Sequence, residues 1–365
     1  MVTPDPTGVE AKPTAELMPV PQESSQTPAS HSPVATERRQ GRLGRLLTNQ
    51  QFILVVVLVL LVIVFTVINP IFFSVSAAGN ILVQWAPIVM IAAGETFVIV
   101  TGGIDLSVGS TLTISSVVAA FAMAGLTGAG WPDGPTLVVG AVVALGIGAL
   151  VGAINAILIN VAKLVPFVAT LATLGAGAGV ALVLTKGGPI AGGPPSASGL
   201  SATIDNGLFS WPVLFVIVIL VVTGLFLHKS RFGRYTFAIG GNAFAATASG
   251  ISVRKHLSKV YILSGLFAGG AGFILYLQLG SGSPSAGTSD ELNAIAAVVI
   301  GGASLAGGFG KLWGTVLGAL ILETVYSGLT IINIDPNWNQ VAVAILIAAA
   351  ASLQAIRGLH LRRRA

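Results

Sequence analysis

The sequence lacks cysteine altogether, and only 8% of its 365 residues are charged. Without cysteine there can be no disulfide, thiolate metal site or cysteine nucleophile. Soluble domains carry about 25% charged residues, so this chain has too little charge to cover a surface in water. Histidine is also scarce: the four histidines lie in the tails or at predicted loop edges, and no cluster has the spacing of metal ligands. Hydrolytic or metal chemistry is therefore not expected.

The chain is instead rich in long hydrophobic segments. Hydrophobic residues make up 54% of it, and its mean hydropathy is +0.89. A membrane core about 30 Å thick takes about 20 apolar residues per helix, and lipid forces the spanning backbone to be helical. We expect an all-α polytopic membrane helix bundle. The sequence contains ten candidate spans, at roughly 52–69, 81–101, 107–126, 136–161, 165–184, 211–228, 259–279, 292–307, 312–332 and 339–356.

The basic residues predict how these spans are oriented. Ten spans place both termini on one side, and we assign that side to the cytoplasm. All but one of the 18 Lys and Arg residues, Lys186, then fall on the inner side or at its edge. Inner loops of membrane proteins carry such an excess of positive charge. The expected location is a bacterial cytoplasmic (inner) membrane, crossed many times.

The chain divides into three predicted parts. Residues 1–50 form a polar cytoplasmic tail, rich in Pro, Ser and Thr and without apolar periodicity, which is typical of disorder. The tail ends in a basic juxtamembrane cluster, and nothing in it resembles a secretory signal. Residues 51–357 form the transmembrane domain, and residues 358–365 form a basic cytoplasmic tail. The inner loop 229–258 is also basic, and either binds anionic lipid or only fixes the orientation.

The first motif is the stretch 94–110, GETFVIVTGGIDLSVGS. A glycine pair weakens a helix, and short polar side chains cap the next one. One interpretation is a broken helix lining a polar translocation path; the other is a tight turn capped by Asp105. Glu95, like Glu323, is either a pathway residue or a buried carboxyl bonded to another helix. The candidate path or broken-helix residues are Glu95, Thr96, Thr101, Gly102, Gly103, Asp105, Ser107, Thr170 and Thr173.

The second motif is glycine-rich and covers residues 298–322. Gly310, Gly314 and Gly318 are spaced four apart, which predicts one helix face that packs closely against a neighbour. The pairs before them suggest another broken span. A phosphate-binding loop is excluded, because Leu305 stands in place of its first glycine and Leu312 follows Lys311. We therefore expect no ATP site and no cofactor in this chain.

The third motif lies in the inner loop, GGNAFAATASGI at 240–251. Asn242 can cap a short helix and Gly250 can end it. A helix this short and rich in alanine is marginal alone. It either docks into a groove on a partner or lies against the bundle. The residues of this candidate coupling loop are Gly241, Asn242, Ala245, Ala246, Ser249, Gly250 and Ile251.

At these motifs, and at VPFVATLATLGAGAGVALVLTKGGPI (165–190), the chain resembles the ribose-type permease subunits of bacterial ABC sugar importers. The resemblance covers roughly residues 50–357. It implies a second permease copy, most simply a homodimer, an extracytoplasmic sugar-binding protein, and ATPase subunits that bind ATP and Mg and often carry two fused nucleotide-binding domains. The ATPase contact would be the loop matching Asn242–Ile251. Ser327 and Ala344 depart from the family pattern, which usually has Asn and often has Gly there.

The sequence thus predicts a permease, not an enzyme, for a monosaccharide such as a pentose or hexose. Its expected surroundings are lipid and protein, not nucleic acid. A branched-chain amino-acid or nucleoside permease of the same superfamily remains an alternative. An ion-coupled secondary transporter would need a coupled set of ionisable groups within the membrane, for which the spans offer only Glu95 and Glu323. A scaffold without transport activity would leave the polar break at 101–110 unexplained.

Overall fold

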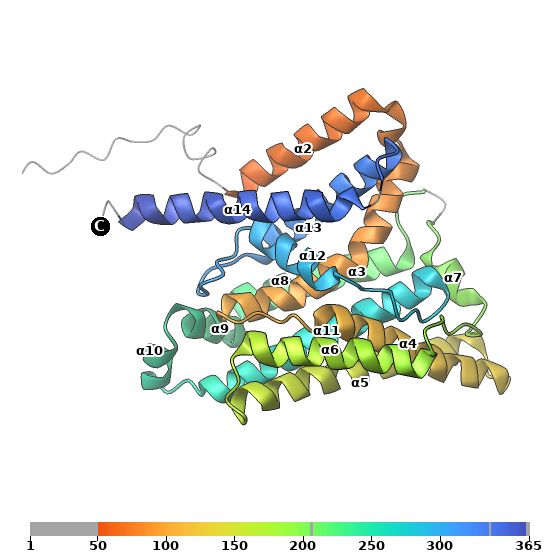
Figure 1. Cartoon of the computed structure of the whole chain (residues 1–365), viewed down its shortest axis with the longest axis horizontal. Helices are drawn as coiled ribbons and strands as arrows, with labels where there is room; N and C mark the ends of the chain where they lie inside the picture. The colour runs from red at the N-terminus through yellow and green to blue at the C-terminus, as the bar shows by residue number, and fades with distance from the viewer. Residues whose placement is uncertain (1–49, 205–206, 336, 363–365) are drawn as a thin grey trace, which may run out of the picture.

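The computed structural model describes residues 50–204, 207–335 and 337–362, with the backbone alone for 351 and 353–362. Within these residues the chain forms thirteen α-helices and no strand. A single antiparallel bridge joins Ile190 to Gly282. Figure 1 shows the long helices packed side by side as one bundle. The predicted all-α polytopic fold is confirmed, while most of the predicted tail 1–50 lies outside the described residues.

Eight helices are long and apolar enough to cross a membrane. They are α2 (Gln50–Ile68), α3 (Val75–Val100), α4 (Val108–Gly128), α5 (Asp133–Asn160), α6 (Pro166–Thr185), α8 (Trp211–Lys229), α11 (Val253–Leu279) and α13 (Leu312–Ile331). Each overlaps one of the predicted spans. The protein is therefore a multi-pass membrane protein.

The other two predicted spans differ from expectation or stay open. Helix α12 (Asp290–Ile300) has 11 residues, and at 1.5 Å per residue it reaches only about half of a membrane core. The predicted span 292–307 was therefore wrong in extent: the helix stops at Ile300, and an irregular segment, 301–311, follows. Helix α14 (Trp338–Arg362) continues into the predicted basic tail. The total of ten crossings stays a prediction.

The loops contain more structure than the sequence suggested. A 3-10 turn, η1 (Pro70–Phe72), joins α2 to α3, and α7 (Ser196–Ser201) lies in the Gly/Pro-rich outer loop. The inner loop folds into two helices, α9 (Arg231–Gly241) and α10 (Ala243–Ala248). Only the second was expected. In Figure 1 both lie at one end of the bundle, away from α7.

Helices α5 and α11 form the most extensive helix–helix contact, and small residues permit it. The buried face of α5 repeats every four residues, at Gly140, Ala144, Gly148 and Gly152. A Cβ added at Gly148 would lie 2.1 Å from the carbonyl oxygen of Gly265. Small residues at this spacing allow helix backbones to touch. The contact holds α11 where it can bond the first break, described below.

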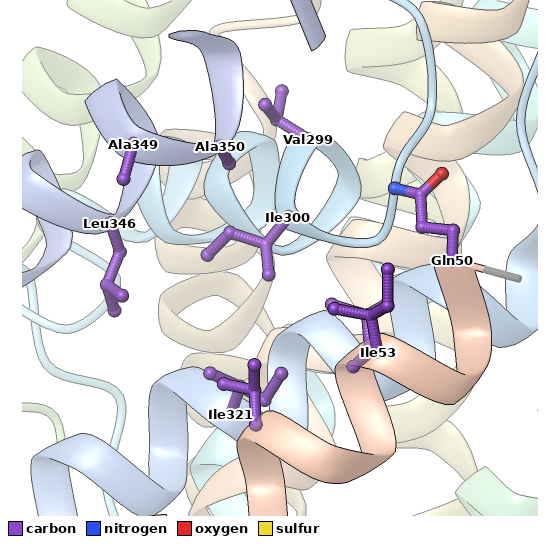
Figure 2. A pocket seen from close by; sticks show the side chains of 10 residues that line it. Gln50, Ile53, Val299, Ile300, Ile321, Leu346, Ala349 and Ala350 are labelled. Carbon is purple, nitrogen blue, oxygen red and sulfur yellow. The ribbon is translucent and has the colours of Figure 1, made fainter. Parts of the chain in front are cut away.

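Helices α2 and α14 lie at one edge of the bundle, and both contribute to an apolar pocket of about 200 Å³ (Figure 2). Gln50, the first residue of α2, and Ala350, midway along α14, line the same pocket. The start of α2 therefore lies beside the middle of α14. That both termini lie on the inner side, as the charge distribution predicts, stays a prediction.

Candidate functional site

The first break separates α3 from α4 and is a compact turn. Helix α3 ends at Val100, and Gly102 takes φ +83°, a conformation that glycine adopts without strain. Helix α4 starts at Val108, with Ser107 before it. Side chains and backbone groups of neighbouring helices bond the turn. Irregular backbone within a membrane is tolerated where protein surrounds it in this way.

Asp105 is the centre of this turn. Its Oδ1 accepts hydrogen bonds from the Ser107 amide (3.0 Å) and hydroxyl (2.6 Å), and its Oδ2 accepts one from the Ser264 hydroxyl on α11 (3.0 Å). The Asp105 amide donates to Oε1 of Glu95 on α3 (3.1 Å). Asp105 thus ties the turn to two helices, which is more than the capping role that the turn interpretation gave it.

The bonding continues into α5 and α6. Asn155 Nδ2 donates to the Ser107 hydroxyl (2.7 Å), and the Thr173 hydroxyl donates to Asn155 Oδ1 (2.6 Å). We call the connected set the polar network; its members are Glu95, Asp105, Ser107, Asn155, Thr173 and Ser264. None of them is more than 8% exposed. The network braces five regions of the chain against one another.

The remaining path candidates are also bonded within the bundle. The hydroxyl of Thr96 lies 2.9 Å from that of Thr315 on α13, and Thr170 donates to the Ile104 carbonyl (3.2 Å). Thr101 donates to the Val98 carbonyl on its own helix. Gly103 packs against the Tyr261 hydroxyl, since a Cβ added at Gly103 would lie 2.5 Å from that oxygen. The geometry favours the turn interpretation over a path lined by these side chains.

The second break, 301–311 between α12 and α13, is held mainly by bonds between backbone groups, with one side-chain acceptor, the Ser304 hydroxyl. The Ser304 amide donates to the Phe309 carbonyl and the Gly307 amide to the Ser304 carbonyl, both at 2.9 Å. Gly302, Gly307 and Gly308 all have positive φ. Only glycine adopts these conformations freely, so the segment's shape depends on them.

The two breaks meet each other and the end of α9. The Gly308 amide donates to the Val100 carbonyl at the end of α3 (2.9 Å). A Cβ at Gly240 would lie 1.8 Å from that same carbonyl oxygen, and one at Gly307 would lie 2.9 Å from both the Gly102 nitrogen and the Gly240 oxygen. We call Gly102, Gly240, Gly307 and Gly308 the glycine junction. Through it the inner loop touches both breaks without an intervening side chain.

The predicted packing face on α13 is only partly a helix face. A Cβ at Gly314 would lie 2.1 Å from the Gly301 oxygen, and one at Gly318 would lie 2.1 Å from the Ala297 oxygen, so both residues pack on α12 and its end. Gly310 precedes the helix and packs on Val100 instead. The prediction placed all three on one helix because it did not foresee where the second break ends.

The short helix α10 has the ends that the sequence indicated. Asn242 Oδ1 accepts from the Ala245 amide (2.9 Å), and Gly250 takes φ +83° after the helix. Ala246 is buried against its own bundle, whereas Phe244 is 85% exposed. Of the candidate coupling residues, the exposed ones are Gly241, Asn242, Ala245, Ser249 and Gly250, while Ile251 is half-buried.

Sequence reasoning missed two features here. Phe244 carried a signal that was not used: it is the single aromatic side chain in a run of small residues. The meeting of Gly240 with Gly307 had no signal, because the two residues lie far apart in the chain and glycine pairs occur throughout it. Among the described residues, no group of three His, Asp or Glu side chains could hold a metal ion.

Comparison with known proteins gives a consistent result. A family described as the permease component of the branched-chain amino acid transport system matches residues 77–351. The ribose import permease protein RbsC of Haemophilus influenzae is 38% identical over 85% of this chain and 94% of its own length. The same-named protein of Bacillus subtilis is 41% identical, over 81% and 90%. The fructose import permease protein FrcC of Rhizobium meliloti is 35% identical, over 82% and 83%. No solved structure matches the chain.

Proposed function

The chain belongs to the family of permease components of the branched-chain amino acid transport system, and we propose that it is the membrane permease subunit of an ATP-driven importer for a monosaccharide. The observation that carries the sugar assignment is the similarity, along most of the chain, to permeases named for ribose, fructose and D-allose. The proposed location is a bacterial inner membrane. The chain itself would supply the path and no chemistry.

We infer that the energy comes from partner ATPase subunits, which would bind ATP and Mg, since this sequence carries no phosphate-binding loop. A binding protein outside the membrane would deliver the sugar, and a second permease copy would complete the path. Switching between outward-open and inward-open states would be a rigid-body change of packed helices.

The geometry of the inner loop supports this coupling. Phe244 presents an apolar ring at the end of the bundle with almost no cover from its own chain. An exposed aromatic is a typical anchor for a partner protein. Phe244 belongs to α10, which follows α9 directly, and Gly240, the next-to-last residue of α9, lies in the glycine junction. Movement of α10 would therefore be transmitted through the end of α9 to both breaks.

A second candidate substrate class is branched-chain amino acids, because the matching family is described by them. An amino acid is a zwitterion, and its recognition requires charged or dipolar partners. The discriminating measurement is which class of solute stimulates ATP hydrolysis by the complete complex.

The coupling proposal is tested by Phe244→Ala in the complex reconstituted with its ATPase and binding protein. Because the ring is exposed, we expect the variant to fold normally and to bind ATPase subunits at least about tenfold more weakly, as expected for loss of an interface anchor. Thermal unfolding checks the fold, and co-purification at graded ATPase concentrations measures binding.

The matched control is Phe215→Ala on α8, whose ring is also exposed but lies in a membrane span, away from the inner loop. We expect normal ATPase binding by this variant. Equal ATPase binding by the wild type and Phe244→Ala would contradict the docking role of α10.

A further inference from the structure

A second pocket, of about 430 Å³, lies between α12, α13 and α14. It involves the first residues of α12 and α14 and the last third of α13. Because α13 starts beside the second break and the glycine junction, its last third lies toward the opposite end of the bundle. This is the end that the charge distribution assigns to the outside.

Most of the residues that line this pocket are polar, and none of them is charged. Six of its ten lining residues carry a hydroxyl or a carboxamide, namely Thr288, Ser289, Asn293, Tyr326, Asn339 and Gln340. No Lys, Arg, Asp or Glu is among the ten. Carboxamides and hydroxyls both donate and accept hydrogen bonds, as do the hydroxyls of a sugar. The pocket of Figure 2, by contrast, has Gln50 as its only polar lining residue.

Part of this lining is already fixed in place. The Tyr326 hydroxyl donates to Asn293 Oδ1 (2.7 Å), and Asn293 Nδ2 donates to Asp290 Oδ1 (3.2 Å). These bonds orient a phenol and an amide from two helices before any ligand arrives. A preorganised lining of this kind lowers the ordering cost of binding.

Asn339 differs, because its Oδ1 is buried and has no hydrogen-bond partner among the described residues. A buried amide oxygen without a donor is costly. Rotation of the amide toward the pocket would let a ligand hydroxyl supply that donor. Among the path candidates, the hydroxyls of Thr96 and Thr173 already bond within the bundle, and Glu95, whose Oε2 is also buried without a partner, does not line this pocket.

We propose that this pocket is a subsite of the translocation path that contacts the hydroxyls of a neutral sugar in transit. The inference rests on the proposed importer function and deepens it. Asn339 Oδ1 would accept from a sugar hydroxyl, and Ala344, which also lines the pocket, would set the space available.

The first test compares Asn339→Ala with the wild type in proteoliposomes holding the complete complex. We expect about three- to tenfold slower uptake of labelled D-ribose per assembled complex, as for one lost hydrogen bond, with unchanged sugar-free ATP hydrolysis. The matched control is Asn337→Ala, two residues earlier, exposed and outside the pocket lining. We expect this control to take up D-ribose at the wild-type rate.

The second test changes the size of the pocket. Ala344→Leu fills part of it, so we expect slower uptake and a larger loss for D-allose than for the smaller D-ribose. Ala348→Leu makes the same change one turn further along α14, at an exposed residue outside the lining, and should leave both rates unchanged. The D-ribose rate also reports whether Ala344→Leu assembles.

The outcomes separate the two proposals. A wild-type complex that takes up no tested sugar would contradict the importer function itself. A wild-type complex that takes up sugar, with Asn339→Ala and Ala344→Leu at the wild-type rate for both sugars, would overturn the subsite alone. Equal losses in the pocket variants and in their controls would overturn it too.

Discussion

The two breaks in this bundle are held in place in different ways. At the first break, the side chains of Asp105 and its partners bond the turn to α3, α5, α6 and α11. At the second, Gly307 and Gly308, which have positive φ, lie directly against the backbone of Gly240 on α9. The hydrogen bonds of the first break come from side chains on several helices, whereas those of the second join backbone groups. The first break is therefore a brace that depends on side-chain hydrogen bonds, and the second is a close backbone contact that depends on the absence of a Cβ.

The largest expected effect is at the brace. Asp105→Ala removes the acceptor of three hydrogen bonds and leaves the donors of Ser107 and Ser264 buried. We expect the free energy of unfolding to fall by about 3 kcal/mol or more. Thermal unfolding in detergent measures it. Asp133→Ala is the control, because the Asp133 carboxylate accepts one exposed bond from the Ser196 amide. If both variants melt alike, the first break is no brace.

The second prediction addresses the glycine junction. Gly240→Ala puts a Cβ 1.8 Å from the Val100 oxygen, whereas Gly241→Ala meets nothing within 4 Å. The first change forces the glycine junction apart, at about 1–3 kcal/mol for overpacking. We expect it to lower ATP-driven uptake about tenfold or more, while Gly241→Ala transports normally. Uptake assays on the pair provide the check, and normal transport by Gly240→Ala would remove the distinction between the breaks.

A smaller effect is expected at the far edge of the polar network. Thr173→Val keeps the side-chain shape but loses the donor to Asn155 Oδ1, so the free energy of unfolding should fall by about 1 kcal/mol. Thr185→Val is matched to it on the same helix, since the Thr185 hydroxyl donates only to carbonyls of its own turn and otherwise accepts one long bond from the nearby Gly187 amide (3.3 Å). We expect the free energy of unfolding of Thr185→Val to fall by only a few tenths of a kcal/mol. Indistinguishable unfolding curves for the pair would show that the network ends before α6.

Local features of the fold could be predicted from sequence, and long-range ones could not. Apolar length gave the eight long helices, and Asn242 with Gly250 gave the ends of α10. The partner of Asp105 on α11, Ser264, lies 159 residues away, and no periodicity reveals it. The extent of α12 was missed because its end, at Ile300, is followed by apolar and glycine residues that still read as membrane-compatible. The polar pocket was missed because its residues come from three separate segments.

We propose that this chain forms the translocation path and that partner subunits drive its conformational change through α10. The most direct measurement is sugar uptake into proteoliposomes, with the purified chain alone and with its ATPase and binding protein. We predict no accumulation by the chain alone under a proton or sodium gradient, and ATP-dependent accumulation by the complete complex. Accumulation against a concentration gradient by the chain alone would contradict the account.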